Sequence, residues 1–271
     1  DVEFHPDFIH PSQDINEAVR NSEVILIATP SAFLKNVMAE LTESLDGKFI
    51  LSATKGIVSD DNSTITEYFR NAFGLSYDNL GLISGPSHAE EVSRNKLSYL
   101  TVACKDEDNA RKIGEMFKSN DFKVSYSTDI YGIEYAAILN NIYALASGLA
   151  YGLGYGDNTK AALITRGITE IGRLGMAMGG RYETFSGLTG IGDLIVTCAS
   201  MHSRNRRAGI LIGQGKSMEE AMAEVKMVVE GVYSAKAAMQ LAKKYNVQLP
   251  IIEQVNLVLF EGKPAAEAVK D

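Results

Sequence analysis

The sequence lacks a long apolar run, an excess of basic side chains and all but 2 cysteines. No apolar run approaches the roughly 20 residues that span a bilayer, so we expect no stable insertion into a membrane. The 26 basic and 34 acidic side chains leave a net charge of −8, which provides no overall attraction for nucleic acid. An anionic substrate must therefore be held by local positive groups.

The two cysteines predict buried, reduced thiols. Cys104 and Cys198 lie far apart in the sequence, and each follows a run of apolar residues, where free thiols are the usual occupants. The first five residues lack the basic and apolar segments of a signal peptide. We therefore expect a cytoplasmic protein.

The first part of the sequence has the pattern of an α/β fold. Short apolar runs alternate with amphipathic stretches, which favours a mainly parallel sheet covered by helices. The expected strands are 24–28, 48–52, 80–84, 97–103 and 122–126. The expected helices lie near 14–21, 31–45, 62–73 and 106–119.

After residue 128 the β-type runs nearly vanish. Long helical patterns rich in alanine, leucine, methionine and glutamate replace them, as at 131–151 and 159–178, and glycine-rich breaks separate the patterns. With 45% hydrophobic residues, the chain is long enough for two domains. The sequence predicts an α/β domain over 1–128 and an all-helical domain over 129–271.

Two segments that follow expected strands are candidate ligand sites, because ligands of open α/β sheets sit beyond the carboxyl ends of strands. Lys55, in Ser-Ala-Thr-Lys-Gly-Ile at 52–57, faces a bound anion or is a solvated turn lysine. In Gly-Pro-Ser-His-Ala-Glu-Glu at 85–91, Ser87 is a candidate helix N-cap and Gly85 allows a ligand to approach the backbone. An ordinary strand-to-helix turn explains the same residues, and His88 is as well explained by a structural role.

The richest candidate site lies between residues 187 and 207. Asp193 precedes an apolar run, where a carboxylate needs hydrogen-bond partners or orients a substrate hydroxyl. Ser203 and Asn205 offer neutral hydrogen bonds, and Arg204 offers a guanidinium fork suited to phosphate. For the neighbouring arginines at 206 and 207 we favour a solvated face.

Six segments occur in order along nearly the whole chain: Ser-Ala-Thr-Lys-Gly-Ile (52–57), Gly-Pro-Ser-His-Ala-Glu (85–90), Ala-Ala-Leu-Ile-Thr-Arg-Gly (161–167), Gly-Ile-Gly-Asp-Leu (190–194), Ser-Arg-Asn-Arg (203–206) and Val-Glu-Gly (229–231). Together they resemble the bacterial-type NAD(P)-dependent glycerol-3-phosphate dehydrogenases. The resemblance implies a Rossmann-like cofactor domain, a helical substrate domain and an active site between them. It also implies hydride transfer between NAD(P)H and dihydroxyacetone phosphate, giving sn-glycerol 3-phosphate for phospholipid synthesis.

The resemblance also implies roles for individual residues. Residues that would hold the substrate are Lys55, Gly85, Ser87, Asp193, Ser203, Arg204 and Asn205. Residues that would contact the NAD or NADP cofactor are Lys55, Ala89, Arg204, Val228 and Glu230. Lys55 and Asp193 stand among the expected catalytic groups.

Two departures from the family pattern bear on activity. The strand and glycine-rich turn with which family members begin has no counterpart here, so we expect the Rossmann-like domain to be incomplete and the sequence to be a fragment. The family's catalytic lysine aligns with Asn140, whose amide has no titratable proton near neutral pH. We hypothesise a chain that keeps the substrate-binding groups and catalyses weakly or not at all.

Two other readings stay open: a related dehydrogenase of 3-hydroxy acids or ketoacids, and a non-catalytic binding protein with the same fold. Turnover of dihydroxyacetone phosphate against unphosphorylated ketoacids separates the first, and binding without turnover favours the second. The choice between NAD and NADP is open, because the residue that usually reads the ribose 2′ position lies in or beside the missing part. The oligomeric state is open too, a homodimer included.

Overall fold

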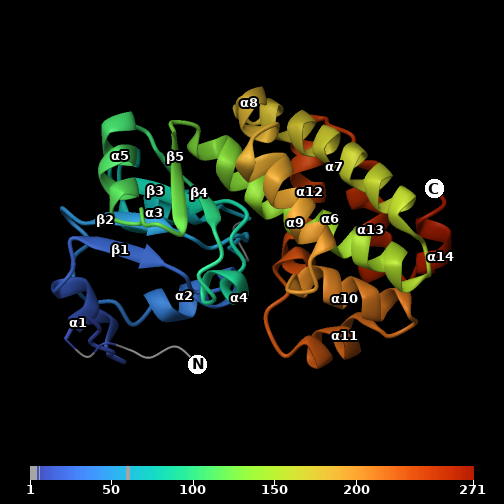
Figure 1. Ribbon diagram of the computed structural model, residues 1–271, viewed down its shortest axis with the longest axis horizontal. Coiled ribbons are helices and arrows are strands. Elements are labelled where there is room, and N and C mark those ends of the chain that lie inside the picture. The colour runs from blue at the N-terminus through green and yellow to red at the C-terminus, as the bar shows by residue number, and fades with distance from the viewer. Residues whose placement is uncertain (1–4, 6, 59–61) are drawn as a thin grey trace.

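The computed structural model describes residues 5, 7–58 and 62–271, and its first part contains a five-stranded sheet (Figure 1). The strands β1 (Val24–Ile27), β2 (Phe49–Ser52), β3 (Leu80–Ser84), β4 (Ser98–Cys104) and β5 (Phe122–Ser127) follow one another in spatial order. The pairings are parallel except β3 with β4, which is antiparallel. The five predicted strands and the mainly parallel sheet are confirmed.

Side chains of the sheet alternate between two apolar layers. In β2, Ile50 packs with α1 (Ile15–Arg20), α2 (Ser31–Met38) and α3 (Ile65–Phe73) on one face. Leu51, the next residue, points to the other face and packs with α5 (Glu107–Glu115). Shorter elements, η1 (Tyr77–Asn79) and α4 (Ala89–Val92), precede and follow β3. Helices on both faces explain why the strands read as nearly continuous apolar runs.

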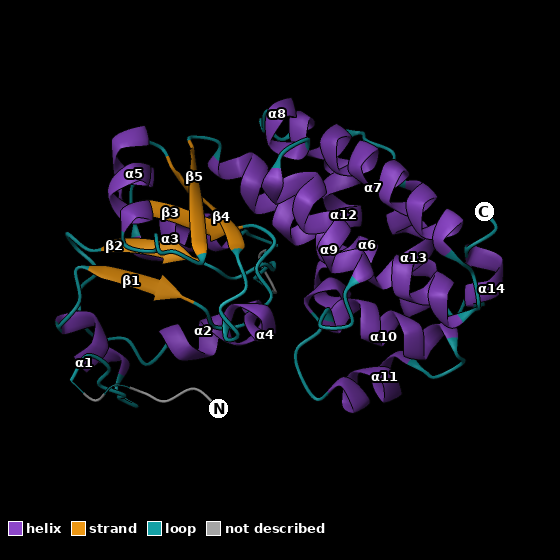
Figure 2. Cartoon of the chain, viewed as in Figure 1, coloured by secondary structure: helices purple, strands orange, loops and turns teal. Residues whose placement is uncertain are grey.

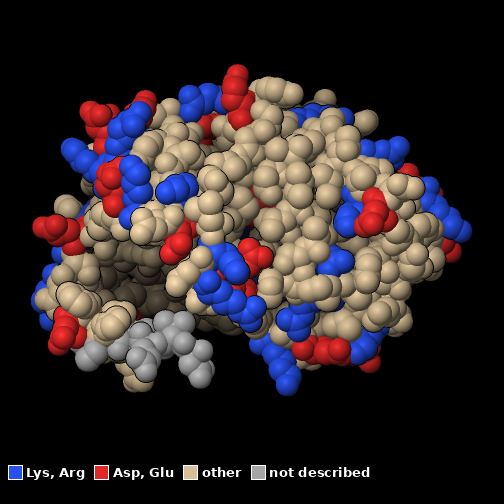
Figure 3. All heavy atoms as spheres, in the orientation of Figure 1, with Lys and Arg blue, Asp and Glu red and all other residues tan. Residues whose placement is uncertain are grey.

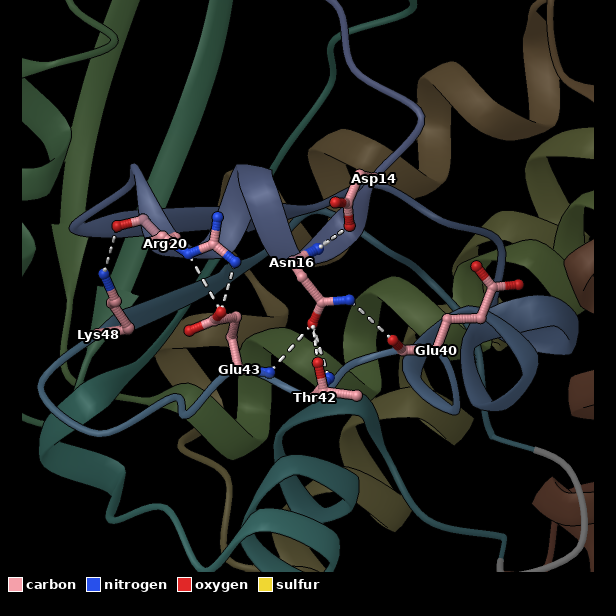
Figure 4. A network of polar contacts seen from close by, with 7 residues as sticks. All are labelled: Asp14, Asn16, Arg20, Glu40, Thr42, Glu43 and Lys48. Atoms are coloured by element: carbon pink, nitrogen blue, oxygen red, sulfur yellow. Dashed lines mark hydrogen bonds and ion pairs between the residues drawn. The ribbon is translucent and has the colours of Figure 1, made fainter.

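The helix expected over 31–45 ends at Met38, and a polar network next to it gives the reason (Figure 4). The side-chain oxygen of Asn16, in α1, accepts hydrogen bonds from the backbone amides of Thr42 and Glu43, at 2.6 and 3.0 Å. The Arg20 guanidinium pairs with the Glu43 carboxylate at 2.6 Å. Because these amides bond to α1, they do not continue α2.

The second part is helical, as predicted (Figure 2). Its elements are α6 (Ile130–Gly152), α7 (Asp157–Ala177), α8 (Tyr182–Phe185), the π-helical turn η2 (Leu188–Gly192), α9 (Asp193–Ala199), α10 (Arg204–Gly213), α11 (Met218–Val225), α12 (Glu230–Tyr245), α13 (Pro250–Phe260) and α14 (Ala265–Ala268). Helix α6 is buried on nearly every side and carries the largest apolar core. A helix that is apolar all round is typical of such a central position. None of the described helices is long and apolar enough to cross a membrane.

Glycines bring α10 into direct contact with the central helix. A Cβ on Gly148 of α6 would lie 2.2 Å from the carbonyl oxygen of Arg206, and one on Gly209 of α10 would lie 2.2 Å from that of Leu145. Only hydrogen at both positions permits this backbone approach. The contact fixes α10, and with it the position of the helix's first turn.

Two buried carboxylates of the helical part bind the starts of helices in the sheet part. Glu134 of α6 accepts hydrogen bonds from the backbone amide and hydroxyl of Thr66, at 2.9 and 2.5 Å. Glu230 of α12 accepts the same pair of bonds from Ser31, at 2.9 and 2.5 Å. Burial raises the pKa of Glu134 to about 7 and also raises that of Glu230. These contacts join the two parts of the chain, and Glu230 also lines the cavity described next.

Candidate active site

A cavity of about 360 Å³ lies where the carboxyl ends of β1 and β2 meet α4, α9 and the first turn of α10. Residues that line it from the sheet part are Ala28, Pro30, Ala53, Thr54, Lys55, Ser87, His88, Ala89 and Glu90. Residues that line it from the helical part are Asn141, Asp193, Thr197, His202, Ser203, Arg204, Asn205, Arg207, Met227 and Glu230. On the face in Figure 3, Lys and Arg side chains gather over α4, although the chain is acidic overall.

An ion pair crosses the cavity between the two parts of the chain. The Lys55 ammonium lies 2.8 Å from Asp193 Oδ2, and the side chains are 30% and 3% exposed. Lys55 follows β2, as the sequence indicated, and Asp193 begins α9. Asp193 therefore has the partner that a buried carboxylate needs, and Lys55 keeps exposed surface for a ligand oxygen.

Asn140 lies behind this ion pair and does not line the cavity. Its side chain is buried and donates hydrogen bonds to the carbonyl oxygens of Thr189 and Gly190, each at 3.2 Å, and to Asp193 Oδ2 at 3.4 Å. Its own Oδ1 has no hydrogen-bond partner among the described residues. Asn140 thus holds the η2 turn and the Asp193 carboxylate, and the structure gives it no access to a ligand in the cavity.

A chain of amides ties three helices to the loop after β2. Asn141 donates to the carbonyl oxygen of Lys55 at 2.9 Å and accepts from the side chain of Asn205 at 2.8 Å. Asn205 in turn accepts from the backbone amide of Gly231 at 2.9 Å. Both asparagines are buried. The predicted substrate residue Asn205 is therefore held rigidly at the cavity wall.

The first turn of α10 supplies the groups that suit an anion. Ser203 is the N-cap, and its hydroxyl accepts from the backbone amide of Arg206 at 3.2 Å. Arg204 is half-buried on the cavity wall. A helix N-terminus, a hydroxyl and a guanidinium fork form a common phosphate-binding set. The sequence placed Ser203, Arg204 and Asn205 together, and the structure brings them together here.

The turn after β3 departs from the sequence prediction in two ways. His88, not Ser87, is the N-cap of α4, and the Ser87 hydroxyl donates to the carbonyl oxygen of Gly85 at 3.1 Å. Gly85 does not line the cavity. It has a φ of +132°, and a Cβ there would lie 2.6 Å from the carbonyl oxygen of Tyr99. Gly85 is thus required by the close approach of β4, and Ser87 and His88 reach the cavity.

The residues predicted to contact the cofactor are only partly gathered. Ala89 and Glu230 line the cavity, whereas Val228 is half-buried outside it. Both oxygens of Glu230 are engaged by Ser31. At the ends of β1 and β2, Ala28 and Ala53 present small apolar side chains that form part of the cavity wall.

The prediction of a solvated face for the two arginines after Asn205 is wrong for Arg206. Its side chain is 5% exposed and lies over the ring of Tyr151, with the guanidinium carbon 4.8 Å from the ring centroid. Arg207 is half-buried and lines the cavity. Helix packing, which charge alone does not reveal, determines both positions.

Asn141, Thr197 and His202 line the cavity although the sequence did not single them out. Two signals were available. Asn141 is a polar residue in a nearly continuous apolar helix, and Thr197 lies one helical turn after Asp193, on the same face. A larger cavity of about 430 Å³, between α7 and α13, contains none of the predicted site residues.

Comparison with known proteins assigns both parts of the chain to one family. Residues 2–110 match the profile of the NAD-dependent glycerol-3-phosphate dehydrogenase N-terminus, and residues 129–270 match that of its C-terminus. Two curated relatives named glycerol-3-phosphate dehydrogenase [NAD(P)+] come from Fusobacterium nucleatum and Agathobacter rectalis. They are 50% and 48% identical to this chain. Each match covers 98% of this chain, and the two matches cover 80% and 79% of the relatives' own lengths.

A solved structure agrees with this assignment. The crystal structure of glycerol-3-phosphate dehydrogenase from Coxiella burnetii matches with a TM-score of 0.88 and 33% sequence identity. The match covers 95% of this chain and 78% of the Coxiella chain. The predicted combination of a Rossmann-like part and a helical part is confirmed.

Proposed function

Because the chain belongs to the NAD-dependent glycerol-3-phosphate dehydrogenase family, we propose that it interconverts dihydroxyacetone phosphate and sn-glycerol 3-phosphate with NAD or NADP as cofactor. The product of the reduction is the backbone of glycerophospholipids. The relatives carry this activity in their names, and the chain spans about four-fifths of their length.

One observation carries the proposal: the Lys55–Asp193 ion pair and the first turn of α10 line the same cavity. The turn suits a phosphate group. The ion pair suits a polar oxygen two carbon atoms away from that phosphate group, because the ammonium attracts an oxygen that gains negative charge. A small ketone with a phosphate at one end matches both groups.

The residues have separate tasks in this proposal. Ser203 and Arg204 hold the phosphate, and Asn205 and Ser87 complete the polar wall around it. Lys55 stabilises the negative charge that develops on the substrate oxygen, and Asp193 orients Lys55.

The cofactor would lie against the small apolar wall at the ends of β1 and β2, with Ala89 and Glu230 at its edge. When bound, the nicotinamide supplies or accepts the hydride. Glu230 keeps Ser31, and so the start of α2, in place beside that wall. Val228, outside the cavity wall, would act through the segment that precedes Glu230.

The test is the loss of NADH or NADPH absorbance on adding dihydroxyacetone phosphate, compared with unphosphorylated ketoacids and hydroxyacetone. We expect turnover of the phosphorylated ketone alone. Faster turnover of a ketoacid would assign the chain to a different dehydrogenase class, and running both cofactors in parallel settles the NAD or NADP preference.

Asn140 favours a second candidate, a binding protein of the same fold with impaired catalysis. The family's lysine position holds an amide that is buried away from the cavity. Calorimetric binding of glycerol 3-phosphate, without turnover by either cofactor, would support this candidate over the enzyme.

We further propose a domain boundary between residues 128 and 129, where β5 has ended and α6 is about to begin. Cys104 and Cys198 are both buried and free, which supports a reducing, cytoplasmic location. We also propose a homodimer without nucleic-acid partners. Light scattering tests the dimer, and a gel-shift assay with DNA and RNA tests the absence of nucleic-acid binding.

A further inference from the structure

His88 has an unusual environment for a turn residue. It is the N-cap of α4, is half-buried and lines the cavity. Its Nε2 atom is buried and has no hydrogen-bond partner among the described residues. Buried polar atoms of proteins nearly always have a partner, so a small rotation of the ring that brings this nitrogen to a ligand oxygen in the cavity would satisfy it.

Charged groups of four segments face this ring. Lys55 comes from the loop after β2, Asp193 from α9, Glu90 from α4 and His202 from the turn before α10. Burial lowers the pKa of His88 below its ordinary value of 6.5, the charges of Lys55 and His202 lower it further, and Asp193 and Glu90 oppose them. Without a ligand the neutral imidazole is therefore favoured, and the negative charge of a bound phosphate ester favours imidazolium again.

Several other groups in and beside the cavity are less suited to exchange a proton with a substrate oxygen. Asn140 is an amide and does not line the cavity. Both oxygens of Glu230 bond to Ser31, and Asp193 is paired with Lys55. The guanidinium groups of the arginines do not titrate in proteins. An imidazole exchanges protons in the neutral range, where a general acid or base is most effective.

We propose that His88 exchanges the proton with the substrate oxygen in this chain, in place of the lysine that Asn140 replaces. The inference rests on the proposed function. In the reduction, the carbonyl carbon receives hydride, the oxygen takes the proton from Nε2, and imidazolium becomes imidazole. In the oxidation, neutral Nε2 takes the hydroxyl proton as the carbon loses hydride.

His202 gives this proton a route to solvent. Its ring lies beside that of His88, with centroids 6.0 Å apart, and its side chain is exposed. Protons can pass between the buried ring and bulk water through this second imidazole or the water around it. Lys55 then acts electrostatically and His88 acts as the acid or base, which divides between two residues the work of a catalytic lysine.

The experiment combines turnover, calorimetry and NMR. We expect His88→Gln to lower kcat by about 10²–10⁴-fold and to remove the pH dependence that the imidazole gives kcat, which is a fall at high pH in the reduction and a fall at low pH in the oxidation. The dissociation constant for glycerol 3-phosphate, measured without cofactor, should change by less than about threefold. His10→Gln, at an exposed position outside the cavity, is the matched control and should leave every value unchanged.

The chain has 4 histidines, so ring NMR signals can be assigned one by one with His→Gln variants. Glycerol 3-phosphate should raise the pKa of wild-type His88, because its negative charge favours imidazolium, and should leave that of His10 unchanged. This titration uses the wild-type protein, so it tests the role of His88 even where His88→Gln does not fold.

Three results would overturn the inference: undiminished kcat in His88→Gln, a loss of kcat matched by an equal loss of affinity, or no response of the His88 pKa to the ligand. Absence of turnover in the wild-type protein is a different result. It refutes the proposed function itself and is seen before any variant is made.

Discussion

Replacement of Asn140 by lysine addresses the most consequential departure of this chain from its family. The Asn140 amide donates to the carbonyl oxygens of Thr189 and Gly190 and to Asp193 Oδ2. A lysine ammonium has three donors, one more than the amide, and its longer side chain could keep the bond to Asp193 while extending toward the cavity. The change also removes the unpartnered Oδ1. We therefore expect the free energy of unfolding to change by less than about 2 kcal/mol.

The gain in activity follows from proton transfer. General acid–base catalysis contributes typically 10²–10⁴-fold, and we expect kcat to rise by about 100-fold, the lower end of this range, in Asn140→Lys. The lower end applies because the new ammonium would share the Asp193 carboxylate with Lys55, 2.8 Å away. In the same background, His88→Gln should reduce kcat much less than it does in the wild type, since the two residues perform one task.

The assay is steady-state NAD(P)H oxidation with dihydroxyacetone phosphate, accompanied by the thermal midpoint and the affinity for glycerol 3-phosphate. Asn71→Lys, which adds the same charge at an exposed position of α3, is the control. If Asn140→Lys folds and binds glycerol 3-phosphate as the wild type does, yet turns over no faster, the assignment of a missing proton donor is refuted.

Three further changes probe the site and its supports. Arg204→Leu should weaken glycerol 3-phosphate binding by about 10- to 100-fold in calorimetry, by loss of the guanidinium fork, and unchanged affinity would remove Arg204 from the phosphate site. Asn205→Ala leaves buried polar atoms of Asn141 and Gly231 unpaired, so urea unfolding should show a loss of about 2–4 kcal/mol. The folded-state pKa of Glu134 is raised from 4.5 to about 7, so its contribution to stability is present below pH 4.5 and is lost as the pH rises to 7. Glu134→Gln should flatten this fall of about 3 kcal/mol in the free energy of unfolding, and an unchanged pH dependence would place its origin elsewhere.

The sheet and the long helices could be predicted because their signals are local. Period-two and period-3.6 apolar patterns gave the five strands and α6 within one or two residues. The end of α2 could not be predicted, since the amides of Thr42 and Glu43 bond to Asn16, which lies in a different helix.

The site was predicted where a residue's chemistry is visible in its neighbours, as with Arg204 and Asp193. It was missed where only the packing of distant segments defines a role. Asn141 bridges the loop after β2 to α10, and Gly85 is required by β4, neither of which the local sequence reveals. His88 looked like an ordinary turn residue until the structure placed it in the cavity with an unpartnered nitrogen.

The most direct test of the central claim is calorimetry of the wild-type protein with sn-glycerol 3-phosphate and with glycerol. We expect saturable binding of the phosphate ester that is at least about 100-fold tighter than binding of glycerol, because the first turn of α10 and Arg204 recognise the phosphate. Equal affinity for the two compounds, or no binding of either, would contradict it.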